Sequence, residues 1–400
     1  MRIVQINAIY GRLSTGVIMR DLRVAIENSA GESYVVFPQK MGMCDDHTYE
    51  MGSWIDHKLH ALLSRFTGRQ SYFSTRATNK LLNWMDDVKP DVVHLHNLHS
   101  NYIHLNMLLH YLAKKDIATV ITMHDCWYFT GGCFHYASAQ CDKWQQGCGD
   151  CPKVKGSVFP LIDATAQVLK DRQKYIAAIP RLRIVGCSKW IANECKKSVL
   201  RDCEISNIYN GFDLDIFKPV QSNLPGKLGI EDKFIILGPA SKWLSELNKN
   251  TFEYFVSAMS DDYLLVLFGA SKTGWAIQSK VMLYGFTNSR EEMVSLYSMA
   301  DVFVNCSRED TLSSLNLEAQ ACGTPVVTYE ATGSKETVDG KCGFAVETGC
   351  AEHLWQKVKD IQKKGKESYT RDCRKRIERN FNKEKNYQKY IDLYRNLTGN

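Results

Sequence analysis

Two acidic residues, Asp310 and Glu318, lie on either side of seven residues in the stretch SREDTLSSLNLEAQACGTPVV, residues 307–327. The pattern predicts a strand over 301–307, a loop, and a short helix that stops at Gly323. Asp310 then lies in the loop and Glu318 about one turn into the helix, so both can reach one elongated ligand. Carboxylates bind sugar and ribose hydroxyls because each accepts two strong hydrogen bonds. The alternative is that Glu318 is an ordinary surface acid.

The start of this short helix favours an anionic ligand. Ser313 or Ser314 is a suitable N-cap residue. The free amides of the first helical turn and the positive end of the helix dipole together form a natural phosphate site. Hydroxyl-binding acids beside a phosphate site favour a sugar nucleotide.

The rest of the chain alternates short β-branched runs with helical stretches, which is typical of parallel α/β units. The expected strands of the first series are 2–8, 33–38, 91–97, 118–125 and 183–188, and those of the second are 233–241, 263–271, 281–286, 301–307 and 324–330. We expect helices from about Val17, over 53–66 and over 76–88, the last two covering the sheet, and helical structure over 351–397. Turn signals in 207–220 predict an interdomain link.

Length and composition agree with a soluble protein of two domains. The chain has 400 residues, a formal net charge of +6 and 44% hydrophobic residues. No apolar run approaches the roughly 18 residues of a membrane-spanning helix, and residues 1–9 read as a strand and not as a leader peptide. The charge does not indicate nucleic acid as a partner. We therefore expect a cytoplasmic protein.

Ligands of doubly wound sheets bind beyond the carboxyl ends of the strands. Polar residues gather at these ends in five places: Gly11 to Gly16, His96, His124, Gly238 to Lys249, and Ser307 to Glu318. We expect them to form the two walls of one cleft.

The segment from Glu318 to Val327 closely resembles the signature of glycosyltransferase family 4, and PDVVHLHN, TMHD, CSKWI, IYNGFDLDIFKP and LYGF are similar to other family segments in the same order. This resemblance implies the GT-B fold, in which two Rossmann-like doubly wound parallel-sheet domains face a central cleft. The acceptor domain would comprise 1–210, completed by the C-terminal helix near 385–400. The donor domain would comprise 211–384. One departure lies upstream, where Asp310-Thr311-Leu312-Ser313 replaces a glycine-containing motif.

The resemblance also implies roles for single residues. Glu318 would bind the ribose, Asp310 the transferred sugar, and the amides of Thr311 and Leu312 sugar or phosphate. His124 would contact the donor sugar, and Gly16, in the turn LSTG, would lie in the first glycine loop. Lys249 matches the family lysine that stabilises the leaving phosphate. The usual arginine is missing near Ala240, and Lys242 is the candidate to replace it.

The implied reaction is transfer of a sugar, with retention at the anomeric carbon, from a UDP- or GDP-linked donor to a saccharide or lipid-linked saccharide acceptor. We expect no catalytic metal, although Asp213 and Asp215 form a D-x-D in the linker. The alternatives are a sugar-nucleotide epimerase of the same fold and a catalytically decayed nucleotide-sugar-binding protein. A dinucleotide oxidoreductase is disfavoured because no strand leads into G-x-G-x-x-G.

Two regions bear on partners beyond the donor. Aromatic and basic residues mix in the helices near 54–66 and 70–86, which suits a lipid-linked acceptor and peripheral contact with the inner face of the membrane; ordinary core helices are the alternative. Cys133, Cys141, Cys148 and Cys151 lie within nineteen residues and end in C-x-x-C. That spacing suits a structural zinc site, with iron, disulfides and free thiols as alternatives.

Overall fold

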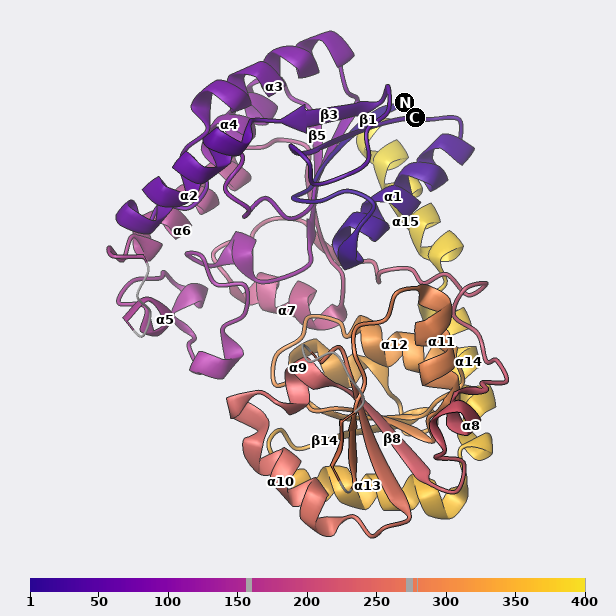
Figure 1. Ribbon diagram of the computed structural model, residues 1–400. Coiled ribbons are helices and arrows are strands. Elements are labelled where there is room, and N and C mark those ends of the chain that lie inside the picture. The colour runs from indigo at the N-terminus through magenta and orange to yellow at the C-terminus, as the bar shows by residue number, and fades with distance from the viewer. Residues whose placement is uncertain (156–159, 271–275, 279, 400) are drawn as a thin grey trace. The chain divides into compact units, whose positions relative to one another are not determined.

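The computed structural model describes residues 1–155, 160–270, 276–278 and 280–399. The chain forms two compact units, which are described separately: Met1–Asn210 with Glu384–Asn400, and Gly211–Lys383. Each unit holds one seven-stranded sheet with helices on both faces (Figure 1). The expected architecture of two Rossmann-like domains is confirmed.

The sheet of the first unit is parallel throughout, in the order β3-β2-β1-β4-β5-β6-β7. Its strands are β1 Arg2–Ile6, β2 Glu32–Pro38, β3 Thr48–Met51, β4 Val92–Leu95, β5 Ala118–Met123, β6 Leu182–Gly186 and β7 Ile205–Asn207. Its helices are α1 Leu13–Asn28, α2 Trp54–Thr67, α3 Thr75–Val88, α4 Leu105–Lys114, α5 Pro152–Lys155, α6 Thr165–Ala177, α7 Lys189–Lys197 and α15 Lys383–Thr398, with 3-10 turns η1 Trp127–Phe129, η2 Ala137–Ala139 and η3 Lys143–Gln145.

The second sheet has the order β10-β11-β9-β8-β12-β13-β14 and is parallel except for the edge strand β10. Its strands are β8 Phe234–Pro239, β9 Tyr263–Phe268, β10 Ala276–Gln278, β11 Val281–Leu283, β12 Val302–Asn305, β13 Val326–Tyr329 and β14 Gly343–Val346. Its helices are α8 Leu224–Leu228, α9 Ala240–Trp243, α10 Lys249–Ala258, α11 Arg290–Met299, α12 Ser314–Ala321, α13 Ala351–Lys364 and α14 Glu367–Asn380, with 3-10 turns η4 Glu246–Asn248 and η5 Thr332–Thr337.

All ten expected strands are present, and all but β2, which begins one residue earlier than expected, are shorter than predicted; the end of the run 263–271 lies outside the described residues at Ser271. Central strands such as β4, β5, β9 and β12 are buried along their whole length. Strands covered on both faces need continuous hydrophobic runs, which is the pattern that the sequence shows. The four strands that the sequence analysis missed, β3, β7, β10 and β14, have only three or four residues each.

The C-terminal helix α15 packs beside α1 on one face of the first sheet (Figure 1). Three tyrosines of α15, Tyr387, Tyr390 and Tyr394, join Leu22 and Ile26 of α1 in one buried cluster. Aromatic side chains bury large areas, so this helix is an integral part of the core of the first unit.

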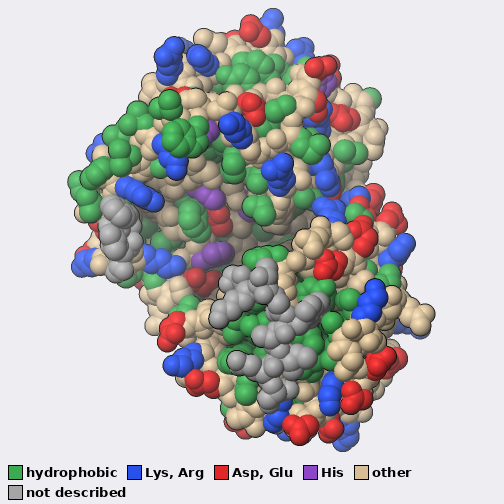
Figure 2. All heavy atoms as spheres, in the orientation of Figure 1, with side chains coloured by type: hydrophobic (Ala, Val, Ile, Leu, Met, Phe, Trp, Pro, Cys, Tyr) green, Lys and Arg blue, Asp and Glu red, His purple; other side chains and the backbone are tan. Residues whose placement is uncertain are grey.

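Helix α2 has a different role from the one expected. Its apolar side chains share one stripe, but the stripe is exposed: Ile55 is 70% exposed and Phe66 50%, and only His60 of this helix is buried. Hydrophobic side chains are visible over α2 on the face drawn in Figure 2. The prediction that this helix covers the sheet is wrong, because helical spacing reveals that apolar residues share a face without revealing what meets that face.

Candidate functional site

Several of the predicted site residues lie in segments that follow the strands at the topological switch point of each sheet. In the first sheet β1 lies between β2 and β4, and in the second β8 lies between β9 and β12, so the strand order reverses at these two places. The segments after β1 and β4 carry Gly16 and His96, and those after β8 and β12 carry Lys242 and Asp310. Doubly wound sheets bind ligands at such points because the diverging loops leave a crevice there.

A buried network of amides and hydroxyls holds the loop after β12. The Asn305 side chain donates to Ser313 Oγ and to Asn316 Oδ1, both at 2.9 Å. Asn316 in turn donates to Thr337 Oγ1 at 2.9 Å. Buried polar networks that are satisfied in this way fix one conformation, so the loop path does not depend on glycines within it.

The backbone of Asp310 is fixed by the turn η5. Its N–H donates to Thr332 Oγ1 at 2.8 Å, and its carbonyl accepts from Gly333 N, also at 2.8 Å. A Cβ atom on Gly333 would lie only 1.8 Å from the Thr311 carbonyl oxygen. The close approach that family glycines would permit in the loop is therefore provided here by a glycine on the opposing turn.

Thr311 and Leu312 are both buried beside this turn. The Thr311 hydroxyl is buried and has no hydrogen-bond partner. A buried hydroxyl without a partner costs free energy, so it is a candidate to hydrogen-bond a ligand.

The first turn of α12 has no side-chain cap. Ser313 occupies the N-cap position, as one of the two expected residues, but it makes no capping hydrogen bond and its hydroxyl accepts from Asn305 instead. The amides at this helix start are thus not occupied by the cap and can bind an anion.

Glu318 lies on α12 and is partly exposed. The buried Tyr297 hydroxyl donates to its Oε2 at 2.9 Å. Burial raises the pKa of Glu318 to about 7, and the opposing effects of Tyr297 and Arg290 are smaller. Glu318 therefore titrates near neutral pH, which is unusual for a surface carboxylate and common at binding sites.

Three cationic side chains belong to the segments around the carboxyl ends of β8 and β12. Asn248 connects two of these segments, since its Nδ2 donates to the carbonyls of Lys242 and Cys306 at 3.0 and 2.8 Å. Its Oδ1 accepts from Arg308 Nε at 3.0 Å. Lys249, the first residue of α10, is exposed, and Lys242 is partly exposed. Arg308, which lies between Ser307 and Asp310, was not among the predicted site residues, because its link to Asn248 spans sixty residues.

A group of histidines lies at the carboxyl ends of β4 and β5 in the first unit. His96 Nδ1 and His124 Nε2 are 3.1 Å apart and share a hydrogen bond, and His96 Nε2 lies 3.3 Å from Gln5 Oε1 on β1. The rings of His94 and His96 are 4.0 Å apart, centroid to centroid. Three neighbouring strands thus contribute to one polar array that ends at His124.

These imidazoles are neutral at physiological pH. Burial lowers the pKa of His124 to about 4, with a smaller effect of His99 and an opposing one of Asp125. Burial and the neighbouring rings place the pKa of His94 and of His96 well below the ordinary value. His124 can therefore act as a hydrogen-bond partner, whereas a cationic role is disfavoured.

Gly16 lies in the first turn of α1, and not in a turn before it. The helix begins at Leu13, four residues earlier than expected, and Leu13 has a positive φ of 52°. The Gly11 amide donates to the Gly16 carbonyl at 2.9 Å, which closes the short loop against the helix. The expectation of a glycine turn over 13–16 is wrong, because Leu13 and not a glycine takes the strained conformation.

Asp213, the first acid of the D-x-D sequence, is engaged by other groups of the chain. The Asp213 carboxylate pairs with Lys383 Nζ and accepts from the Asp215 amide at 3.1 Å, and Asp215 is exposed. Asp213 therefore acts as a turn cap and an ion-pair partner.

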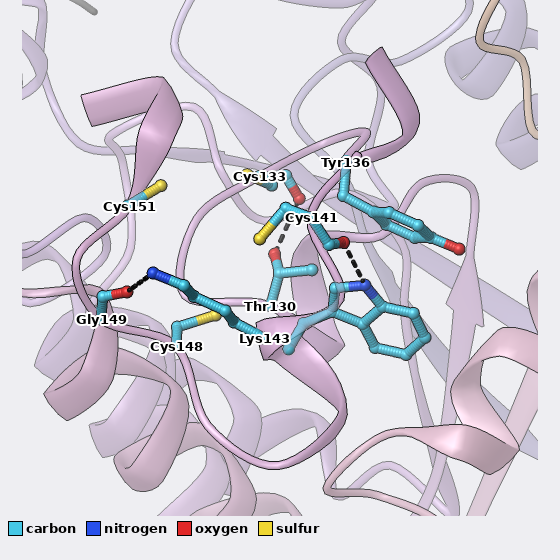
Figure 3. Close-up of a pocket in the computed structure, with 9 residues that line it drawn as sticks. Thr130, Cys133, Tyr136, Cys141, Lys143, Cys148, Gly149 and Cys151 are labelled. Atoms are coloured by element: carbon cyan, nitrogen blue, oxygen red, sulfur yellow. Dashed lines mark hydrogen bonds between the residues drawn. The ribbon is translucent and has the colours of Figure 1, made fainter. Parts of the chain in front are cut away.

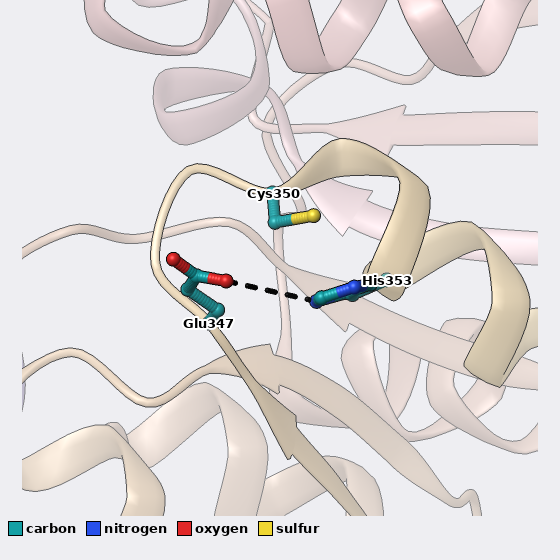
Figure 4. A group of neighbouring side chains, drawn as sticks. All are labelled: Glu347, Cys350 and His353. Carbon is teal, nitrogen blue, oxygen red and sulfur yellow. Dashed lines mark ion pairs between the residues drawn. The ribbon is translucent and has the colours of Figure 1, made fainter.

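Glu347, Cys350 and His353 form a small group of side chains of metal-binding type near the start of α13 (Figure 4). Glu347 and His353 are 3.9 Å apart, with side chains 71% and 56% exposed. Such exposed pairs are common without an ion, so this group does not indicate a metal centre.

Two family profiles match the chain, one in each unit. Residues 32–216 match Glycosyltransferase Family 4, and residues 249–384 match Glycosyl transferases group 1. Together they cover most of the chain. The chain belongs to glycosyltransferase family 4.

Similar proteins agree with this membership. The putative colanic acid biosynthesis glycosyl transferase WcaC of Escherichia coli (strain K12) is 23% identical over 266 residues, which are 64% of each chain. The match therefore spans less than two thirds of that relative. Sucrose-phosphate synthase from Thermosynechococcus elongatus aligns over 100% of this chain and 99% of its own at 15% identity, with a TM-score of 0.73. Anabaena HepE in complex with UDP and glucose aligns over 98% of both chains at 14% identity, with a TM-score of 0.62. The fold is GT-B.

Most of the predicted site residues are distributed over the two family matches. His124 lies within the first match, and Lys249, Asp310 and Glu318 lie within the second. Gly16 and Lys242 lie outside both matches. No helix among the described residues has the length and hydropathy to cross a bilayer.

Proposed function

We propose that this member of family 4 transfers a sugar from a UDP- or GDP-linked donor to a hydroxyl of a saccharide or lipid-linked saccharide, with retention at the anomeric carbon. The observation that carries the proposal is the placement of Glu318, with a pKa near 7, beside an uncapped helix start at the switch point of the second sheet. The names of WcaC and of the HepE complex support a role in cell-surface polysaccharide or glycolipid synthesis and a nucleotide-sugar donor.

The donor would bind along the segment 310–318. The ionised Glu318 carboxylate accepts from both ribose hydroxyls, and the amides at the start of α12 bind the diphosphate. Thr311 directs its unpaired hydroxyl to the diphosphate or sugar, and Asp310 accepts from hydroxyls of the sugar. A sugar nucleotide has the ribose hydroxyls, the diphosphate and the sugar hydroxyls that these groups would bind.

The bond from the anomeric carbon to the diphosphate oxygen breaks, and negative charge develops on that oxygen. Lys249 and Lys242 stabilise this charge, and Arg308 is a third cation near them. We propose that these fixed cations replace a catalytic metal, because Asp213 is already paired with Lys383. The leaving phosphate takes the proton of the attacking acceptor hydroxyl, so that no covalent enzyme intermediate is needed.

His124 would act as a neutral hydrogen-bond partner of the donor sugar. Its Nε2 is engaged with His96 at 3.1 Å, which fixes the orientation of the ring. A neutral imidazole leaves the cationic groups as the stabilisers of the leaving phosphate. The histidine is assigned the uncharged role because its burial keeps it neutral.

The exposed stripe of α2 favours a lipid-linked acceptor. Ile55, Leu59, Leu62 and Phe66 are all at least 50% exposed, and Lys58 and Arg65 lie beside them. A helix with an exposed apolar stripe and basic flanks suits the surface of an anionic membrane. A cavity of about 590 Å³ lined by Arg69, Tyr72 and Phe73 follows the end of this helix and could receive the head of such an acceptor.

The test is a screen of UDP- and GDP-sugars with and without a lipid-linked saccharide acceptor, with the anomeric configuration of the product determined by NMR. We expect a glycosylated product of retained configuration only when acceptor is present. Interconversion of the donor sugar without acceptor would indicate an epimerase, and calorimetric donor binding without any product would indicate a decayed enzyme. Turnover should not require added magnesium or manganese; a strict requirement would restore Asp213 and Asp215 as candidate ligands.

A further inference from the structure

The four clustered cysteines lie in the long segment that joins β5 to α6. Cys133, Cys141, Cys148 and Cys151 line one cavity of about 20 Å³, together with Thr130, Tyr136, Lys143, Trp144 and Gly149. All four are free thiols, and their sulfur atoms point toward the common cavity (Figure 3). Residues separated by up to eighteen positions have thus been brought to one place.

Contacts outside the sulfur atoms hold the backbone near each cysteine. The Thr130 hydroxyl donates to the Cys133 carbonyl at 2.8 Å, and Trp144 Nε1 donates to the Cys141 carbonyl at 3.0 Å (Figure 3). The Cys151 amide donates to Asp163 at 2.6 Å. Lys143 Nζ donates to the carbonyls of Gly149 and Asp150 at 3.2 and 2.8 Å, within the turn between the last two cysteines. These hydrogen bonds therefore fix the backbone from which the four cysteine side chains project.

A buried cation lies next to this cluster. Arg172, on α6, is 1% exposed, and its Nη2 has no hydrogen-bond partner. Its guanidinium stacks on the Trp127 ring at 3.7 Å. Among the described residues, no carboxylate forms an ion pair with it. In the described part of the chain, Asp125 is the one carboxylate among its electrostatic neighbours, and a further anionic group nearby would stabilise the buried guanidinium.

One peptide group connects this cation to the cluster. Arg172 Nη1 donates to the Thr130 carbonyl at 2.7 Å. The N–H of the same peptide unit, that of Gly131, donates to Cys148 Sγ at 3.2 Å. One peptide unit therefore joins the guanidinium to the Cys148 sulfur; burial raises the pKa of this thiol, and the Gly131 amide and Arg172 oppose that rise.

We propose that Cys133, Cys141, Cys148 and Cys151 bind one zinc ion as four thiolates, with Arg172 as the buried counter-charge. Binding releases the four thiol protons to solvent and forms four Zn–S bonds, which leaves a dianionic centre. Disulfides and free thiols would add no negative charge beside Arg172, whereas the thiolate centre would add to that of Asp125.

Closure of the site requires the four sulfur atoms to move closer together. Zn–S bonds of about 2.3 Å place tetrahedral sulfurs roughly 3.8 Å apart. In the part of the chain that the structure describes, no three of these sulfurs lie within 4.8 Å of one another. The side chains therefore have to turn inward around the cavity that they already share. Between Cys133 and Cys151 only Trp144 is buried, so zinc would fix a stretch that has little apolar core of its own.

The first experiment is elemental analysis of the whole protein purified without chelators. We expect about one equivalent of zinc in the wild type, loss of that zinc in Cys148→Ser and Cys133→Ser, and retention in the matched controls Cys44→Ser and Cys203→Ser. Cobalt added to chelator-treated protein should give the visible spectrum of a tetrahedral tetrathiolate site, which does not depend on activity.

The second experiment tests the counter-charge by competition with a chromogenic chelator. Arg172→Gln should bind zinc at least tenfold more weakly than the wild type, and Arg172→Lys should recover part of this loss. If Arg172→Gln does not fold, the cobalt spectrum of the wild type still decides the ligand set. Metal-free protein with four alkylatable cysteines, disulfides detected by mass spectrometry, or iron in place of zinc would overturn the proposal.

Discussion

The two units present their candidate residues in opposite ways. In the second unit, Asp310, Thr311, Leu312 and Glu318 follow one another along a single loop and helix. In the first unit, Gln5, His96 and His124 come from three strands that are far apart in the sequence. The first arrangement can be recognised in a stretch of sequence, whereas the second exists only when the sheet aligns β1, β4 and β5. The chemistry of the two units also differs. The candidate groups of the second unit are carboxylates and cations, and those of the first unit are neutral imidazoles.

The largest effect should come from Glu318→Ala. Loss of two charge-assisted hydrogen bonds should weaken donor binding roughly 10³-fold by calorimetry. Glu318→Gln keeps an acceptor for Tyr297 and should fold normally, as thermal melting will show, while still losing most donor affinity. Glu330→Ala, at an exposed site, is the control. Donor affinity equal to that of the wild type in Glu318→Ala would refute the central assignment.

Lys249→Ala should lower kcat about 10²-fold with a smaller effect on donor affinity, because charge on the leaving phosphate grows toward the transition state. Steady-state kinetics and calorimetry together separate the two effects. Lys242→Ala and Arg308→Ala, measured in parallel, compare the three cations. If Lys249→Ala left kcat unchanged while Lys242→Ala abolished turnover, the family lysine would have been assigned to the wrong position.

His124→Ala should lower kcat/KM roughly tenfold, a change that corresponds to the free energy of one hydrogen bond between uncharged groups. His96→Phe keeps an aromatic ring but removes the nitrogen that orients His124, so we expect a smaller loss that appears in kcat more than in KM. His110→Ala, on the exposed side of α4, is the control. An effect of His96→Phe larger than that of His124→Ala would show that His96 itself contacts the substrate.

The smallest effect should be the pH dependence of donor binding. A pKa of about 7 means that Glu318 is mostly protonated at pH 6 and half ionised at pH 7. The ionised form accepts more hydrogen bonds, so donor affinity should rise about fivefold between these values. This rise should be absent in Glu318→Gln. A pH-independent affinity in the wild type would show that the carboxyl group ionises at ordinary acidic pH.

The sequence was sufficient for features that depend on neighbours along the chain. Continuous apolar runs predicted ten of the strands, because strands covered on both faces must be apolar throughout. The short helix after Asp310 and its start after Ser313 were also predictable, although the Ser313 hydroxyl makes no capping hydrogen bond. The start of α1 was misplaced because nothing in the local pattern marks Leu13 for a positive φ.

Contacts between distant segments were decided by the tertiary structure alone. The apolar stripe of α2 was visible in the sequence, but its exposure depends on what the neighbouring elements leave uncovered. Arg308 meets Asn248, and His96 meets His124, only because parallel strands bring their carboxyl ends to one edge. The four clustered cysteines could be recognised in the sequence as a candidate metal site. The peptide unit that connects Arg172 to Cys148 is visible only in the folded structure. A sequence lists the charges of a protein, and only packing determines which of them are buried and so need a partner.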